Sequence, residues 1–178
     1  IPSHLAEFFE PAACGQCYMC RMVEVFREVK RVLRDDACLF LNVGDSYAGS
    51  PGNGRGGGEQ VEGGLPHYSS SVKAAPGLKP KDLIGVPWRL AFALQQDGWY
   101  LRSDIIWHKP NCQPESVKDR PTRSHESIFL LSKSERYHYD HEAVREPANG
   151  TGTLRNRRSV WAINTEAYPG AHFATFPP

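Results

Sequence analysis

The sequence has 178 residues, of which 40% are hydrophobic and 23% are charged, and its formal net charge is +1. This length suffices for one domain with a real core, and the composition is ordinary for a soluble globular protein. A net charge so close to zero forces neither a nucleic-acid nor a membrane partner, so any basic binding site must be local. No apolar run approaches the roughly 18 residues of a membrane span, and the N-terminus lacks the features of a signal peptide.

The two ends indicate a piece of a longer protein, and the cysteines indicate the redox compartment. It begins with Ile1 rather than Met and ends at residues 174–178 without a polar tail, so we interpret it as a piece of a longer protein. The five cysteines are an odd number, and Cys14, Cys17 and Cys20 are crowded into one C-x2-C-x2-C pattern. This is not the spacing of a secreted disulfide scaffold, and it favours a reducing, cytoplasmic setting. The same three thiols suit a zinc ion, but a tetrahedral site needs a fourth ligand, and ordinary thiols remain the alternative.

The first elements are a helix and a buried strand. Residues 18–34 show a helical stripe of apolar side chains with charged residues on the other face. After the Asp35-Asp36 turn, residues 39–43 read as a strand that Gly44 and Asp45 close. Asp45 therefore stands where open α/β sheets place ligand-facing groups, although a turn-forming aspartate is the plainer alternative.

A long segment without periodicity follows. Residues 48–77 are rich in Gly and Ser, so they predict a mobile loop. The glycines do not form a phosphate-binding loop, because no G-x4-G-K-[ST] pattern is present.

Order returns with a second helix and two more strands. Pro87 and Gly98 bracket a helix over residues 87–96. Residues 101–107 and 127–132 read as strands, separated by a polar loop with three prolines. This order predicts an α/β fold with an antiparallel strand pair at one edge of the sheet.

Two groups of residues suggest binding. The strand over 101–107 ends in Trp107, His108, Lys109, Pro110 and Asn111, which can stack on, neutralise or hydrogen-bond a ligand. The alternative is a core tryptophan, a solvated lysine and a simple turn. Beyond Ser134 the periodicity fades, and the densest positive cluster stands there: Arg155, Arg157 and Arg158. Arginine binds phosphates and reads guanine edges, but a solvated loop is equally compatible with the pattern.

The phrases GDSY, W-x-K-P-N and H-E-x-x-F-L-L-S-K, in this order, resemble a known family. They are similar to the DNA amino-methyltransferases that act on N4 of cytosine or N6 of adenine, in the permuted beta-class order. In that class an [SDN]-P-P-Y tetrapeptide comes first and a Gly-rich S-adenosylmethionine loop comes last. Neither motif is in this sequence, so the resemblance implies an internal fragment with an incomplete Rossmann-like sheet and no catalytic tetrapeptide of its own.

The resemblance also implies a division of the chain. Residues 1–133 would form a partial catalytic α/β domain with the loop over 48–77, residues 134–168 a target-recognition-like region, and residues 169–178 the start of a cofactor-binding segment. The closing residues would hold the methionine end of S-adenosylmethionine: His172, Phe173, Thr175, Phe176 and Pro177.

The remaining site residues follow from the same likeness. The base to be methylated must be flipped out of the duplex into a pocket. Trp107 would stack there, Asn111 would bond a base edge, and Lys109 would bind a phosphate, with Asp45 at the same pocket. Double-stranded DNA would bind Arg155, Arg157 and Arg158, with Arg120 and Arg123 as weaker candidates.

The sequence therefore predicts a site-specific DNA methyltransferase of a restriction-modification kind, encoded by a bacterium, an archaeon or a phage. The alternative is a non-catalytic zinc-binding or nucleic-acid-binding module. We expect the isolated chain to be poorly stable and to bind S-adenosylmethionine weakly or not at all, because the strands that bear the two missing motifs would leave apolar surface uncovered.

Overall fold

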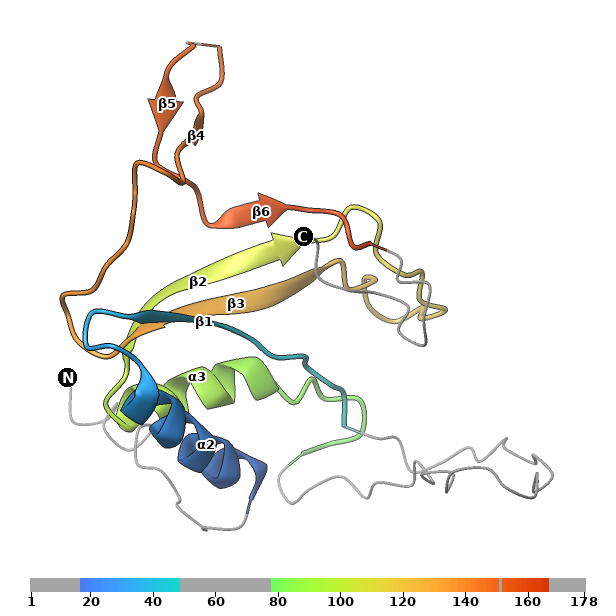
Figure 1. Ribbon diagram of the computed structural model, residues 1–178. Helices are drawn as coiled ribbons and strands as arrows, with labels where there is room; N and C mark the ends of the chain where they lie inside the picture. The colour runs from blue at the N-terminus through green and yellow to red at the C-terminus, as the bar shows by residue number, and fades with distance from the viewer. Residues whose placement is uncertain (1–16, 49–77, 151, 167–178) are drawn as a thin grey trace, which may run out of the picture. The chain divides into compact units, whose positions relative to one another are not determined.

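The computed structural model describes residues 17–48, 78–150 and 152–166. The chain divides into two compact units, one formed by residues 44–86 and the other by the segments on either side. The larger unit contains the helices and strands labelled in Figure 1, except for Val86, the first residue of α3, which belongs to the smaller unit. None of the described helices is long and apolar enough to cross a membrane.

The larger unit is built on a mixed four-stranded sheet with the order β1-β3-β2-β6. Strand β3 runs antiparallel to both of its neighbours, and β6 runs parallel to β2 (Figure 1). The bounds are β1 Cys38–Asn42, β2 Tyr100–His108, β3 His125–Ser132 and β6 Val160–Ala162. A separate two-stranded ribbon pairs β4 (Glu146–Pro147) with β5 (Leu154–Arg155).

The three predicted strands and the antiparallel pairing of β2 with β3 are confirmed, but the position of that pair differs from the prediction. It lies inside the sheet rather than at one edge, because β1 adds to β3 and β6 adds to β2. The short strand β6 lacked any periodic signal in the sequence. Its three residues come from the segment predicted as a separate recognition region, yet they join the main sheet.

The two predicted helices are present with slightly different ends. Helix α2 spans Tyr18–Val32, two residues shorter than predicted, because Leu33 already has an extended backbone. Helix α3 spans Val86–Gln96 and ends before Gly98, whose φ of 89° suits glycine. A mixed sheet together with these two helices fits the predicted α/β class.

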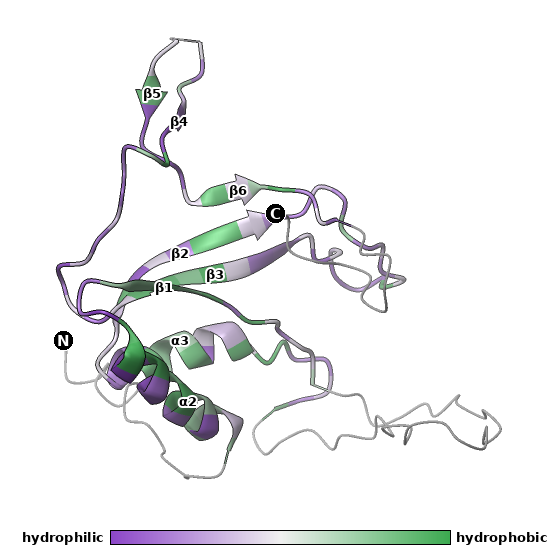
Figure 2. Ribbon diagram, viewed as in Figure 1, coloured by the Kyte–Doolittle hydropathy of each residue, from purple (hydrophilic) through white to green (hydrophobic). Residues whose placement is uncertain are grey.

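The helices and three of the strands share one hydrophobic core. Leu41 of β1 lies opposite Phe129 of β3, and Leu39 lies opposite Leu131, so one face of this strand pair is apolar. In Figure 2 both helices carry hydrophobic and hydrophilic colours, as expected for amphipathic helices packed on a sheet. The buried members of the core are Phe26, Leu41, Leu90, Ala91, Leu94, Trp99, Phe129 and Leu131.

A lysine at the end of β3 binds the end of α2. The ammonium group of Lys133 donates to the carbonyl oxygen of Leu33 at 2.8 Å and to a carboxylate oxygen of Asp35 at 3.0 Å. The Lys133 side chain is only 17% exposed. The ammonium N–H donates to a carbonyl that the helix leaves without an internal partner, and the positive charge complements the negative end of the helix dipole.

In the smaller unit, the two chain segments that flank residues 49–77 are hydrogen-bonded to each other. Ala48 donates its backbone N–H to Asp82 and accepts from Lys81, at 2.8 and 3.0 Å, and Ile84 donates to Ser46 at 2.9 Å. Residues 49–77, which contain nearly all of the predicted mobile loop, lie outside the described residues. Ala48, the last residue before this gap, is therefore adjacent to Lys81 and Asp82, which stand shortly after it.

Candidate functional site

Trp107 lies near the end of β2 and binds the residue that follows β6. The residue is 4% exposed, and its indole N–H donates to the carbonyl oxygen of Ile163 at 2.9 Å. The backbone N–H of Ile163 in turn donates to the carbonyl of His108 at 3.0 Å. Trp107 is therefore a buried residue whose polar atom already has a protein partner, and its predicted role in base stacking stays a prediction.

Lys109 is paired with a carboxylate. Its ammonium group binds Glu126 of β3, and the two side chains are 17% and 28% exposed. The same ammonium lies 4.4 Å from the centre of the Trp107 ring, within the range of a cation–π interaction. The predicted phosphate contact would compete with Glu126 for this charge.

Asn111 makes a set of hydrogen bonds with one residue 54 positions later. Its amide nitrogen donates to the carbonyl oxygen of Thr165 at 2.9 Å, and its amide oxygen accepts the backbone N–H of Thr165 at 2.9 Å. The Thr165 hydroxyl adds a third bond to that oxygen at 3.3 Å. The Asn111 side chain thus pairs with a backbone segment as a neighbouring strand would.

Asp45 stands in the smaller unit and binds backbone amides. One oxygen of its carboxylate accepts from the N–H of Ser46 and from the N–H of Val86, both at 2.9 Å. Val86 is the first residue of α3, where a carboxylate satisfies an unpaired N–H group and complements the helix dipole. The structure gives Asp45 this capping position, and a role at a base pocket stays a prediction.

Two of the three clustered arginines share one glutamate. The Nε atoms of Arg155 and Arg158 lie 3.0 and 2.6 Å from the same oxygen of Glu146, whose side chain is 17% exposed. Burial alone would raise the pKa of Glu146, but the hydrogen bonds from Arg158 and Arg155 outweigh it and hold that pKa below its usual value. These bonds join β4, β5 and the segment before β6.

Arg157 has a different environment. Its guanidinium carbon lies 5.2 Å from the centre of the Trp161 ring, and the Trp161 indole donates to the carbonyl of Arg158 at 2.8 Å. A hollow of about 600 Å³ is lined by the next three residues, Arg158, Ser159 and Val160. Among the three arginines, Arg157 is the one that the structure places on an aromatic ring rather than on Glu146.

The weaker candidates in the loop between β2 and β3 are bonded locally. Arg120 lies 2.6 Å from a carboxylate oxygen of Glu115, and this contact lowers the pKa of Glu115. Arg123 donates from Nε to the carbonyl of His125 at 3.2 Å. Both contacts shape the loop, and DNA binding by these two arginines stays a prediction.

The predicted zinc and cofactor residues are described only in part. Cys17 and Cys20 have their sulfur atoms 3.4 Å apart, and Cys14 lies outside the described residues. Within residues 17–48, 78–150 and 152–166, no group of three His, Cys, Asp or Glu residues could hold a metal ion, so a zinc site is not supported. The predicted cofactor residues also lie outside these ranges: His172, Phe173, Thr175, Phe176 and Pro177.

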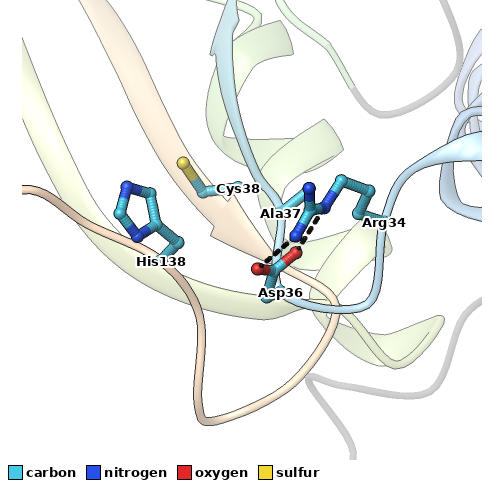
Figure 3. A pocket seen from close by; sticks show the side chains of 5 residues that line it. All are labelled: Arg34, Asp36, Ala37, Cys38 and His138. Carbon is cyan, nitrogen blue, oxygen red and sulfur yellow. Dashed lines mark hydrogen bonds and ion pairs between the residues drawn. The ribbon is translucent and has the colours of Figure 1, made fainter.

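A second hollow, of about 430 Å³, lies where the chain turns from α2 into β1 (Figure 3). Arg34 and Asp36 bind each other there through two hydrogen bonds of 2.9 and 3.0 Å, which lower the pKa of the Asp36 carboxyl. His138 donates its backbone N–H to the carbonyl of Asp36 at 2.7 Å. These polar groups satisfy one another, which indicates a structural junction.

Three partner residues were missed in the sequence. Glu126 neutralises Lys109, Glu146 binds two arginines, and Thr165 binds Asn111. Glu126 could have been found from the sequence, because it is a charged residue in the H-E-x-x-F phrase, at the polar start of a strand that is otherwise apolar. The other two depend on chain segments that meet only in the folded protein.

Comparison with known proteins now identifies the family. The sequence model described as DNA methylase matches residues 15–178. This chain belongs to the DNA methylase family. Type II methyltransferase M.SmaI from Serratia marcescens is 59% identical over 161 residues, which are 90% of this chain and 54% of that protein. Type II methyltransferases M.XycI from Xanthomonas campestris pv. cyanopsidis and M.Cfr9I from Citrobacter freundii are 58% and 57% identical. The DNA methylase chain spans about half the length of these curated relatives.

Proposed function

We propose that the full-length DNA methylase transfers a methyl group from S-adenosylmethionine to an exocyclic amino nitrogen of a flipped base in double-stranded DNA. The acceptor is N4 of cytosine or N6 of adenine. The observation that carries this proposal is that three relatives named Type II methyltransferases match 90% of the chain at 57–59% identity. We further propose a site-specific role in restriction-modification, in the cytoplasm of the cell.

The chemistry assigns separate tasks to the chain and to the rest of the protein. The lone pair of an exocyclic amine is delocalised into the ring, so acceptors must bind the amine hydrogens before the nitrogen can attack the methyl group. In the family this task belongs to the [SDN]-P-P-Y tetrapeptide, which we place outside this sequence. The sheet β1-β3-β2-β6 would be one side of a larger Rossmann-like sheet, to which the strands bearing the tetrapeptide and the cofactor loop add.

We assign DNA contact to the segment from β5 to β6. Arg155, Arg157 and Arg158 stand within four positions, and Glu146 neutralises part of their charge. Arg157 is exposed and is the best placed of them for a phosphate or a base edge. A place near the target base is proposed for Lys109. The cofactor contact is proposed for His172, Phe173, Thr175, Phe176 and Pro177.

The test is a methyl-transfer assay with the full-length protein, tritiated S-adenosylmethionine and DNA duplexes that cover all short recognition sequences. We expect label in DNA, and nucleoside mass spectrometry should then find N4-methylcytosine or N6-methyladenine. The chain of residues 1–178 alone is the control and should transfer no methyl group. A full-length protein that binds S-adenosylmethionine and DNA but labels neither base would refute the proposal and favour a non-catalytic binding module.

A further inference from the structure

Cys17 and Cys20 lie together at the start of α2. Cys17 caps the helix with an extended backbone, and Cys20 stands in the first turn. The thiol of Cys17 donates to the sulfur of Cys20, and the two sulfur atoms are 3.4 Å apart. The helical turn itself fixes the spacing of the two residues, because the N–H of Arg21 donates to the Cys17 carbonyl at 3.1 Å. Backbone structure therefore holds the two thiols in contact.

This contact is close to the geometry of a disulfide. An S–S bond is about 2.05 Å long, so the sulfur atoms of Cys17 and Cys20 need to approach by about 1.4 Å to form one. Rotation about the side-chain torsions of the two cysteines moves their sulfur atoms while the backbone stays in place. The open pair is thus arranged for closure before any reagent arrives.

The surroundings of the pair suit thiol–disulfide exchange. Cys17 is exposed and Cys20 is half-buried, so a small molecule in solution can reach the Cys17 sulfur. The first turn of α2 carries no acidic residue that would repel an anionic sulfur. Backbone N–H groups at a helix N-terminus stabilise negative charge nearby, and the thiolate is the form that attacks a disulfide.

Two other described cysteines offer a contrast. Cys38 and Cys112 are half-buried, and Cys17 with Cys20 is the one pair in residues 17–48, 78–150 and 152–166 whose sulfur atoms are in contact. A single thiol stops at a mixed disulfide with the small molecule, whereas a second thiol beside it can displace that molecule. The chain therefore carries its own internal comparison for a paired and an unpaired cysteine.

We propose that Cys17 and Cys20 form a redox-active dithiol that closes to a disulfide by exchange with a low-molecular-weight disulfide such as oxidised glutathione. This modification site is separate from the proposed methyl transfer and does not depend on it. In a reducing cytoplasm the pair stays open, and it closes when the pool of small thiols becomes oxidised.

The reaction has two steps. The Cys17 thiol first loses its proton to water, and its sulfur attacks the small-molecule disulfide; a Cys17–S–S bond forms, the S–S bond of the reagent breaks, and one small thiolate leaves and takes up a proton. The deprotonated Cys20 sulfur then attacks the Cys17 sulfur, and the second small thiolate leaves and takes up a proton. The two cysteines lose two electrons, and the reagent gains them as two thiols.

The test is peptide mass spectrometry of the full-length protein, quenched in acid after equilibration with glutathione. The Cys14→Ser variant is used, so that the third thiol of the C-x2-C-x2-C motif cannot take part. Two groups held side by side have an effective concentration of at least millimolar order, about tenfold above reduced glutathione at about 0.1 mM. The closed Cys17–Cys20 disulfide should therefore be about ten times as abundant as the mixed disulfide at Cys17.

Three variants serve as comparisons. Cys20→Ser removes the second thiol, so the mixed disulfide at Cys17 should become the end product. Cys17→Ser should abolish closure in the same way. Cys112→Ser is the matched control and should leave closure unchanged, because Cys112 stands in the loop between β2 and β3, away from α2 in the sequence.

Several outcomes would overturn the proposal. One is a mixed disulfide at Cys17 that exceeds the closed form although Cys20 is present. Another is absence of reaction at Cys17 and Cys20 under conditions that modify Cys112. A metal ion that stays bound to the pair in Cys14→Ser and blocks exchange would also exclude a redox role. If Cys14→Ser does not fold, fragmentation of the wild-type peptide decides: a bond between Cys17 and Cys20 supports the proposal, and one that joins Cys14 contradicts it.

Discussion

Replacing Arg157 by alanine should change how the affinity for DNA depends on salt. Arg157 is exposed and lies 5.2 Å over the Trp161 ring, while Arg155 and Arg158 share the carboxylate of Glu146. Three positive charges and one negative charge leave this segment with a net charge of +2. Removing Arg157 halves that net charge without breaking either contact of Glu146.

The magnitude follows from counterion release. Each phosphate contact contributes about −0.9 to the slope of log K against log salt concentration for duplex DNA. A protein that loses one contact should thus lose about 3.5-fold more affinity at 50 mM salt than at 200 mM salt, because salt changes fourfold over that range. The loss should be similar for cognate and unrelated duplexes if Arg157 binds a phosphate.

The assay is fluorescence anisotropy of labelled duplexes with the full-length protein at four or five salt concentrations. Arg31→Ala is the matched control, because it removes the same charge from the exposed face of α2, where Arg31 pairs with Glu28. Identical affinity for wild type and Arg157→Ala at every salt concentration would refute the DNA contact. A loss restricted to the cognate duplex with an unchanged slope would instead show that Arg157 reads a base edge.

Three further substitutions test other parts of the structure. Lys133→Met should lower the free energy of unfolding by about 2 kcal/mol in urea titration, because it removes a charged donor from the end of α2. The exposed Lys118→Met is the control and should change this free energy little. If the two variants lowered it by the same amount, the capping role of Lys133 would be refuted. Asp45→Ala should cost about 1 kcal/mol through the loss of the amide contact at Val86, measured in the same way, with the exposed Glu135→Ala as the comparison. Glu146→Gln should destabilise the protein at neutral pH. Because the folded pKa of Glu146 lies below its ordinary value of 4.5, the stability that its ionised form contributes is present above pH 4.5 and is lost as the pH falls through the folded pKa. Thermal unfolding of wild type and variant should converge in acid, and a gap that persists there would contradict the assignment.

Elements with strong periodicity could be predicted from the sequence, and those that depend on distant partners could not. The apolar stripe of α2 and the apolar runs of β1, β2 and β3 are visible in the residues of each element itself. Their bounds could therefore be predicted from the sequence to within about two residues. Strand β6 has three residues, of which Trp161 alone is a large aromatic, and it exists because β2 offers an edge to pair with. Its partner is more than 50 residues away, and no local pattern reports such a pairing.

The same distinction holds for the candidate site. The residue types of the W-x-K-P-N motif were recognised as chemically capable, but their partners decide what they do. Asn111 is occupied by Thr165 and Lys109 by Glu126, and neither pairing is visible until the strands are placed side by side. The arginine cluster was found by density alone. In the structure, Arg155 and Arg158 bind Glu146, whereas Arg157 lies against the Trp161 ring.

The paired segments around Ala48 and Lys81 bear on which substitutions the smaller unit can accept. Ser46 and Ala48, just before residues 49–77, are hydrogen-bonded to Lys81, Asp82 and Ile84, a few residues after them. The hydrogen bonds among these described residues involve backbone atoms alone, so they hold the two flanking segments together whatever side chains stand there.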